Sequence, residues 1–245
     1  MPERVTSRRG GPSVVLDPRR ASAVVRAPGR LALEDDASES DGDALALAAR
    51  HRYLRALAAD RFDEALEAAR AAARHAETLA DIGHCDAARV LAATGRWAEA
   101  IDEQRRAART APASRRSFHL WTLGAFEQFA GRHAAALRTF RRAETWAARG
   151  RALVRAHAAY CMLEAGMAAP RLRAVTTALA RSPSREGYGQ FLLGMIAWHV
   201  GDRARASVHL RAFLRRNAAV DRAKAIGLRE ELRRAREVLA RIDSD

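Results

Sequence analysis

The sequence predicts an all-α fold in which pairs of antiparallel helices repeat along the chain, because small residues and turn residues recur at one spacing. Alanines in similar contexts, such as GRWAEA and GRHAAA, recur at steps of 35, 36 and 70 residues. These alanines are Ala65, Ala100, Ala136 and Ala206. The residues at the expected turns, which tolerate a left-handed backbone, are Asp60, Gly95, Gly131, Gly166 and Gly201. Five turns at one period predict five helix pairs within residues 44–219.

The clearest pair spans residues 117–143 and shows why small residues matter. Gly124 and Ala136 lack bulk where two antiparallel helices must approach closely, and Gly131 can adopt the left-handed conformation that ends a helix. At the place of Gly124 the other pairs hold Tyr53, Ala88, Ala159 and Gly194. The tyrosine predicts a wider helix crossing in the first pair. In the fourth pair Arg171 stands where the alanine is expected, which predicts altered packing there.

The order of these residues resembles the tetratricopeptide repeat, whose signature runs from an aromatic residue through Leu-Gly to Ala, Phe and Pro over about 34 residues. The third pair carries it as Leu123-Gly124, Ala136 and Phe140. One such unit cannot bury its apolar face alone, so neighbouring units must stack. The resemblance implies a right-handed α-solenoid of about five helix pairs, in which the first helix of each pair faces the concave side.

Residues 1–43 differ from the rest and are predicted to form a disordered tail. They lack helical periodicity, and their charge is +5 over the first 30 residues and −6 over the last 13. The alternative is a short docking motif in the apolar fragments Val14-Val15-Leu16 and Ala23-Val24-Val25. The basic start lacks the apolar run of a secretory signal. Only Lys224 of the 43 basic residues is lysine, a bias that favours a bacterial, cytoplasmic protein.

Residues 220–245 are predicted to form a capping helix that closes the last pair. The residues that fall on one helical face are Leu228, Leu232, Ala235, Leu239 and Ile242. The opposite face carries arginines and glutamates. This pattern predicts one continuous helix over Asp221–Ile242, with an apolar stripe against the core and a charged side in water.

The chain lacks the sequence signatures of catalysis and of metal binding. We find no nucleophile elbow, phosphate-binding loop or zinc-protease motif, so an enzyme is not expected. Cys85 and Cys161 lie two repeats apart and are expected to be reduced thiols. The eight histidines are scattered, so neither a metal nor another cofactor is expected. No apolar run approaches the ~18 residues that span a bilayer, which predicts a soluble protein without a membrane partner.

The net charge of +14 raises the question of nucleic acid. The arginines are spread over every repeat and mixed with acids, and no recognition signature focuses them, which favours a solvated basic surface. The alternative is a regulatory or nucleic-acid-associated module. Its best candidate residues are Arg115-Arg116 with Arg141-Arg142, and Arg211 with Arg215-Arg216.

The concave side that the resemblance implies is rich in aromatic residues in its C-terminal half. The expected lining residues are Phe118, Trp121, Gln128, Phe129, Tyr160, Leu163, Tyr188, Phe191, Met195, Trp198 and His199. Because exposed aromatic residues are preferred interface anchors, this set favours a non-catalytic protein-binding scaffold that holds a peptide or partner helix. The alternative is that several of them, especially Trp121, Phe126 and Phe191, pack between repeats.

The best-known peptide site of this family grips a chaperone's C-terminal carboxylate. In this chain the positions that correspond to the clamp residues hold Arg50, Leu54, Asp86, Phe118 and Thr122. Only the arginine is of a compatible type, so capture of chaperone tails is not expected. The sequence leaves the partner's identity and the oligomeric state open.

Overall fold

The computed structural model describes residues 41–148 and 150–244, and within these ranges every regular element is a helix. The predicted all-α class is therefore confirmed. The tail predicted for residues 1–43 lies outside the described residues except for its last three, which belong to α2 (Asp41–Ala58). Within the described ranges no helix combines the length and the apolar content that crossing a membrane requires.

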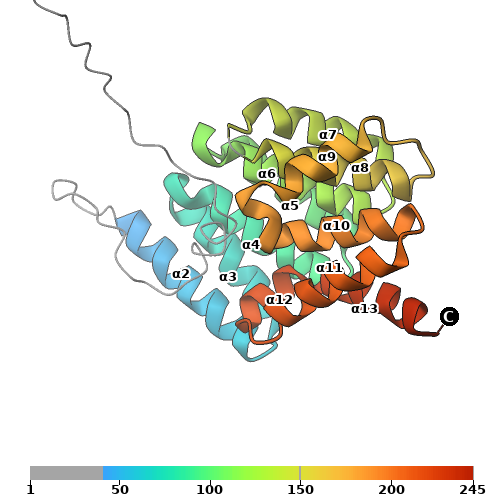
Figure 1. The fold of residues 1–245 in the computed structure, drawn as a ribbon. Coiled ribbons are helices and arrows are strands. Elements are labelled where there is room, and N and C mark those ends of the chain that lie inside the picture. The colour runs from blue at the N-terminus through green and yellow to red at the C-terminus, as the bar shows by residue number, and fades with distance from the viewer. Residues whose placement is uncertain (1–40, 149, 245) are drawn as a thin grey trace, which may run out of the picture.

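Five helical hairpins follow one another along the chain (Figure 1). Their first helices are α2 (Asp41–Ala58), α4 (Ala80–Ala93), α6 (Ala113–Phe129), α8 (Arg151–Glu164) and α10 (Tyr188–His199). Their second helices are α3 (Phe62–His75), α5 (Trp97–Thr110), α7 (His133–Trp146), α9 (Leu172–Ala180) and α11 (Arg203–Arg216). Short 3-10 turns, Glu77–Leu79 and Pro183–Glu186, precede α4 and α10. Helices of one pair pack on each other, and neighbouring pairs stack.

The five predicted turns are present, and they share one backbone geometry. Asp60, Gly95, Gly131, Gly166 and Gly201 all have positive φ, between 56° and 81°, and lie 35 or 36 residues apart. In each turn the next N–H donates to the carbonyl five residues before it, as from Arg96 to Leu91 at 2.8 Å and from Arg132 to Glu127 at 2.8 Å. This is the bonding pattern of a Schellman helix end, which favours glycine at the left-handed position.

The predicted close approach of helices within a pair is also present. A Cβ atom added to Gly124 would lie 2.6 Å from the ring of Phe140, and one added to Gly194 would lie 2.6 Å from the side chain of Leu210. Gly83 makes a third close approach that the repeat signature did not indicate. Its added Cβ would lie 2.6 Å from the backbone nitrogen of Ala73 on the preceding helix.

The fourth pair departs from the others where the sequence indicates a mismatch. Arg171 adopts a left-handed conformation with φ of 56°, and α9 begins directly after it. This second helix has only nine residues, whereas α3, α5, α7 and α11 each have fourteen. Leu179 is its one residue that is buried. The arginine therefore marks the pair with the least helix–helix packing.

The continuous C-terminal helix predicted for Asp221–Ile242 is wrong. The chain forms two helices, α12 (Arg222–Gly227) and α13 (Arg229–Ser244), which are separated at Leu228. The reason is that the two halves pack on different parts of the molecule. α12 contacts α2 and α4, whereas α13 contacts α10 and α11. We refer to residues 222–244 as the C-terminal segment.

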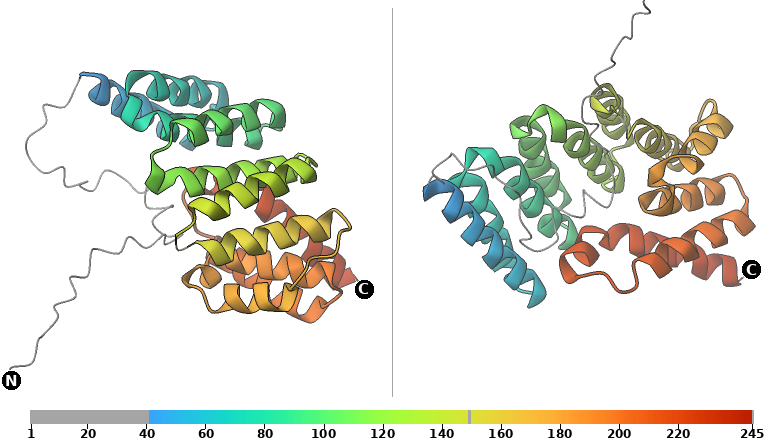
Figure 2. Two further views of the ribbon diagram at one scale, coloured as in Figure 1. Left: turned by 90° about the horizontal axis from the view of Figure 1, so that it is seen from above. Right: turned by 60° about the vertical axis from the view of Figure 1, so that its left-hand side comes forward.

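The five pairs follow an arc, and the C-terminal segment lies across its open side (Figure 2). At one end of this segment Ile226 packs into the core cluster that contains Tyr53 and Leu57. Farther along, Leu232 and Leu239 join the cluster of the last two pairs. The C-terminal segment therefore belongs to the cores of both the first and the last helix pairs.

Candidate binding surface on the inner wall

The C-terminal segment contacts the first helix of every pair. We call the sides of α2, α4, α6, α8 and α10 that face it the inner wall. Contacts with α2 come from α12, and Arg229 donates a hydrogen bond to the carbonyl of Ala93 at the end of α4, at 2.7 Å. Arg234 and Glu231 of α13 contact α6, α8 and α10. The inner wall thus holds a helix of the same chain.

Arg234 makes the most extensive of these contacts. Its guanidinium carbon lies 4.7 Å from the centroid of the Phe129 ring on α6. Its Nη1 atom donates to the hydroxyl of Tyr160 at 2.9 Å and to Glu164, both on α8. Glu230 of its own helix accepts from its Nε atom at 2.7 Å. Only 16% of the Arg234 side chain is exposed, so these partners replace most of its water.

Glu231 provides the second polar contact, one turn before Arg234. The hydroxyl of Tyr188 on α10 donates to its Oε1 atom at 2.9 Å. Burial raises the pKa of Glu231 to about 7, because a buried carboxylate loses its hydration. The same burial raises the pKa of Tyr188, so its hydroxyl stays protonated and acts as a donor.

The residues predicted to line a groove lie on or near this wall, and most have little exposure. Gln128, Tyr160, Phe191 and Met195 are buried. The half-buried members are Phe118, Trp121, Phe129, Leu163, Tyr188 and Trp198, and His199 is exposed. Phe191 lies within the core, as the packing alternative describes. The binding role of the set as a whole stays a prediction.

The structure brings four of these aromatic rings and Phe140 together around His157, which sequence reasoning missed. The rings of Phe140, Tyr188 and Trp121 lie 4.7, 5.6 and 5.7 Å from its own. His157 is fully buried, and neither ring nitrogen has a hydrogen-bond partner within the described residues. Burial lowers the pKa of His157 to about 3. Its position one turn before Tyr160 was the signal available in the sequence.

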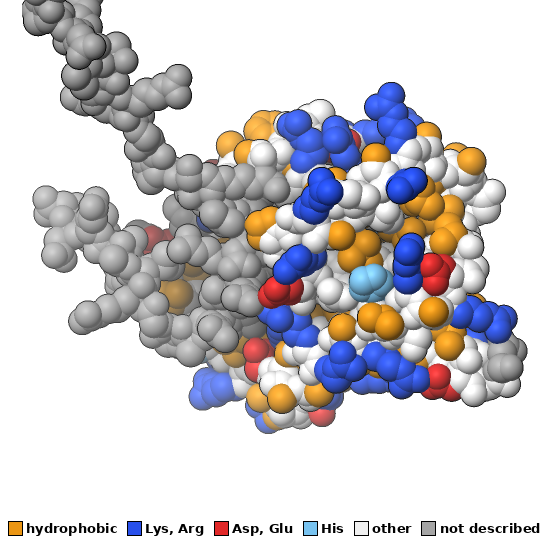
Figure 3. All heavy atoms as spheres, viewed as in Figure 1, with side chains coloured by type: hydrophobic (Ala, Val, Ile, Leu, Met, Phe, Trp, Pro, Cys, Tyr) orange, Lys and Arg blue, Asp and Glu red, His pale blue; other side chains and the backbone are white. Residues whose placement is uncertain are grey.

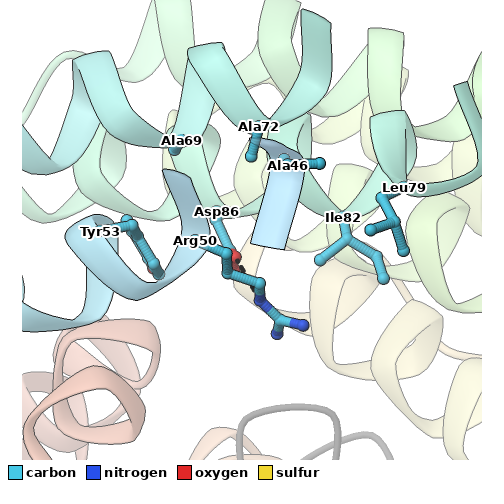
Figure 4. A pocket seen from close by; sticks show the side chains of 9 residues that line it. Ala46, Arg50, Tyr53, Ala69, Ala72, Leu79, Ile82 and Asp86 are labelled. Atoms are coloured by element: carbon cyan, nitrogen blue, oxygen red, sulfur yellow. Dashed lines mark ion pairs between the residues drawn. The ribbon is translucent and has the colours of Figure 1, made fainter. Parts of the chain in front are cut away.

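Nearer the N-terminus a small hollow opens between α2, α3 and α4 (Figure 4). Arg50 and Asp86 meet there, with 3.6 Å between Nε and Oδ2. Arg89 also donates to Asp86, at 3.2 Å. Burial raises the pKa of Asp86. Arg50, the one residue of compatible charge at the chaperone-clamp positions, therefore already faces a carboxylate of its own chain.

The first three pairs are linked by buried carboxylates. Asp81 on α4 accepts from both nitrogens of the Arg115 guanidinium fork, at 2.7 and 2.8 Å, and from Nε2 of His119 at 2.8 Å. In the same way, Glu103 on α5 accepts from Arg70 at 2.9 Å and from His84 at 2.8 Å. The links from Arg70, Arg115 and His119 join helices of different pairs, so they fix how neighbouring pairs stack, whereas His84 and Glu103 join the two helices of the second pair.

His119 has a strongly raised pKa within this network. Burial opposes its charged form, but the hydrogen bonds with Asp81 and Cys85 raise the pKa of His119 to about 9. A thiol, an imidazole and a carboxylate therefore lie close together, as they do in a nucleophilic site. All three side chains are more than nine-tenths buried, so no substrate can reach the sulfur atom. The arrangement stabilises the stacking of helices.

Among the described residues no three or more His, Cys, Asp or Glu side chains gather as metal ligands would. Cys85 and Cys161 are buried free thiols. Burial raises the pKa of Cys161 to about 12, which keeps it protonated and unreactive.

Comparison with protein-family models, curated proteins and solved structures finds no match to this chain.

Proposed function

We propose that the chain is a non-catalytic protein-binding scaffold, a right-handed solenoid of five tetratricopeptide-like helix pairs that holds a helix of a partner protein on its inner wall. One observation carries this proposal. The C-terminal segment is an amphipathic helical segment, and it contacts the first helix of all five pairs. The wall therefore has the shape and the chemistry to hold a helix.

The binding mode is that of a helix in a groove, with an apolar face for affinity and polar contacts for register. Leu232, Ala235, Val238 and Leu239 bury the apolar face of α13. Each well-buried aliphatic side chain contributes about 1.5–3 kcal/mol before ordering costs are subtracted. A partner helix with a similar face would gain affinity from the same wall residues.

A half-buried aromatic edge remains where a partner could make first contact. The ring centroids of Phe118 and Trp121 lie 6.2 Å apart, and those of Trp121 and Tyr188 lie 4.8 Å apart. These three residues keep part of their surface in water. Aromatic side chains in such partly open positions are frequent anchors of protein interfaces.

The test is capture of a partner from the native cell by the full chain, followed by direct binding of the purified partner. Phe118→Ala with Trp121→Ala should lower the partner's affinity at least tenfold while leaving the helical circular dichroism unchanged. Trp146→Ala is the matched control, because Trp146 is 44% exposed on a second helix, α7. Equal binding by both variants would contradict the proposal. Phe191 is unsuitable for this test, because its truncation would leave a cavity in the core.

A second candidate function, a regulatory or nucleic-acid-associated module, is favoured by the concentration of arginines on the last of the second helices, α11. α3 carries three acids and two arginines, whereas α11 carries five arginines and no acid. Arg215 and Arg216 are both exposed, and arginines outnumber acids on the face that Figure 3 shows. Binding of a labelled oligonucleotide should then weaken steeply between 50 and 200 mM salt, by roughly tenfold or more. Arg215→Ala with Arg216→Ala should reduce it, and absent binding at low salt would exclude this candidate.

A further inference from the structure

The polar contacts of α13 define what the inner wall recognises. Arg234 lies between a ring, a phenol and a carboxylate that come from two different first helices. Glu231, one turn earlier, accepts from Tyr188 on a third. Because these partners are spread over α6, α8 and α10, a helix meets all of them only in one register and one direction. The wall therefore selects a spacing of charged residues as well as an apolar face.

The C-terminal segment leaves some hydrogen-bonding capacity of this wall unused. Three wall side chains have buried polar atoms without a partner within the described residues, namely Nε1 of Trp121, Oε1 of Gln128 and both ring nitrogens of His157. Gln128 donates to Glu164, the carboxylate that also binds Arg234, at 2.7 Å. The ring of Trp121 contacts Tyr188, the donor to Glu231. The residues that carry the unpaired atoms thus touch the wall residues, Glu164 and Tyr188, that bind Arg234 and Glu231 of α13.

We propose that the inner wall recognises amphipathic helices that carry a Glu-x-x-Arg pair beside an apolar stripe, and that the C-terminal segment occupies the wall until such a partner helix replaces it. The arginine of the partner would take the place of Arg234 against Phe129, Tyr160 and Glu164. Its carboxyl group would accept from Tyr188. A partner with further polar groups would also pair the atoms that the C-terminal segment leaves unpaired. This inference rests on the proposed scaffold function and names the chemistry of the partner.

The first experiment uses the full chain and a fluorescent peptide of residues 220–244. In the wild type the attached C-terminal segment competes with the peptide at a high effective concentration, so binding should be weak. Arg234→Glu places a carboxylate beside Glu164, which should release the attached segment and tighten peptide binding at least tenfold. Arg233→Glu is the matched control, because Arg233 is exposed and pairs with Glu230 and Glu237 of its own helix. A folded Arg234→Glu chain that binds no more peptide than this control would overturn the proposal.

A second experiment needs no variant that could fail to fold. Saturating unlabelled peptide should accelerate deuterium uptake by the attached α13 of the wild type and leave α6 and α10 protected. Unchanged uptake by α13 would overturn the proposal. Dimers that exchange their C-terminal segments, detected by light scattering, would overturn it too, because the occupant would then be a second copy. If a cellular partner is captured but the peptide never binds, this inference fails while the scaffold function stands. If the peptide binds and no partner is captured, the scaffold function fails.

Discussion

In the first three helix pairs buried carboxylates connect one pair to the next, whereas in the last two pairs aromatic rings fill the corresponding space. Asp81 joins helices of different pairs through Arg115 and His119, and Glu103 does so through Arg70. Tyr160, Tyr188 and Phe191 instead pack ring against ring, at centroid distances of 5.5–5.9 Å. Both regions have the same turns and the same spacing. The repeat therefore determines where helices end and cross, but not what packs between the pairs.

Two buried histidines, one in each region, make the difference between the regions measurable through the pH dependence of stability. Hydrogen bonding to Asp81 keeps His119 charged, with a pKa of about 9, although burial opposes it. Burial keeps His157 neutral, with a pKa of about 3. Rising pH therefore weakens the first region, and falling pH weakens the second.

Asp81→Asn should lower the free energy of unfolding by about 3–5 kcal/mol, because it leaves Arg115 and a protonated His119 without their carboxylate. Urea unfolding at pH 7 measures the loss. Glu99→Gln is the control, since Glu99 forms an exposed ion pair with Arg96 at the start of α5. The unfolding midpoint of this variant should match that of the wild type. Similar midpoints for the two variants would show that the buried links do not hold the first pairs together.

Raising the pH from 6.5 to 9 should remove up to about 3 kcal/mol of stability. The folded pKa of His119 is raised above its unfolded value of about 6.5, so its contribution is complete below pH 6.5 and is lost as the pH approaches 9. Unfolding in urea at several pH values measures how the free energy of unfolding changes with pH. This change should be smaller in Asp81→Asn, and an equal change in that variant would assign the effect to another group.

Lowering the pH from 6.5 to 5 should remove about 2 kcal/mol through His157. Its folded pKa is depressed, so the unfolded chain takes up the proton first, and stability falls by about 1.4 kcal/mol per pH unit below pH 6.5. His157→Leu keeps the site apolar and should reduce the acid loss by that amount relative to the wild type. If this variant lost as much free energy of unfolding as the wild type between pH 6.5 and 5, the prediction would be contradicted.

Gly124→Ala should destabilise the chain by about 1 kcal/mol, because the added methyl group meets the ring of Phe140 and the helical preference of alanine offsets part of the clash. Gly194→Ala should cost about as much, since its methyl group meets Cγ of the buried Leu210 at 2.6 Å and lies 3.2 Å from the Leu210 backbone nitrogen. Thermal unfolding of the two variants gives the comparison. A loss at Gly194 that is clearly smaller would show that the last pair is the less tightly packed.

The local features of the fold could be predicted because each depends on a few neighbouring residues. A glycine such as Gly131 determines a helix end, and a glycine facing Phe140 determines a crossing. Some polar links between neighbouring pairs also left a signal that the prediction did not use. Arg115 lies 34 residues after Asp81, and Glu164 lies 36 residues after Gln128, which is one repeat in each case. Polar residues compared at one-repeat spacing would have indicated both.

The contacts of the C-terminal segment left no such signal. Arg234 lies 74 residues from Tyr160, and Arg229 lies 136 residues from Ala93. The apolar stripe correctly indicated a helix that packs on the last pair, and α13 does so. It could not indicate the change of direction at Leu228, because that depends on α2 and α4 at the other end of the arc. The exposure of aromatic side chains on the wall depends on contacts with α13 that are likewise distant in sequence, such as those of Arg234 with Phe129 and Tyr160.

The hydrogen bond between Arg222 and Asp60, which are 162 residues apart, joins the last helices to the first turn. A linear array of repeats contacts only its neighbours, so it can fray from either terminus and melt in steps. Here the terminal repeats are tied to each other through α12, so neither of them can fray alone. Heating should therefore melt the helical body cooperatively, in a single transition.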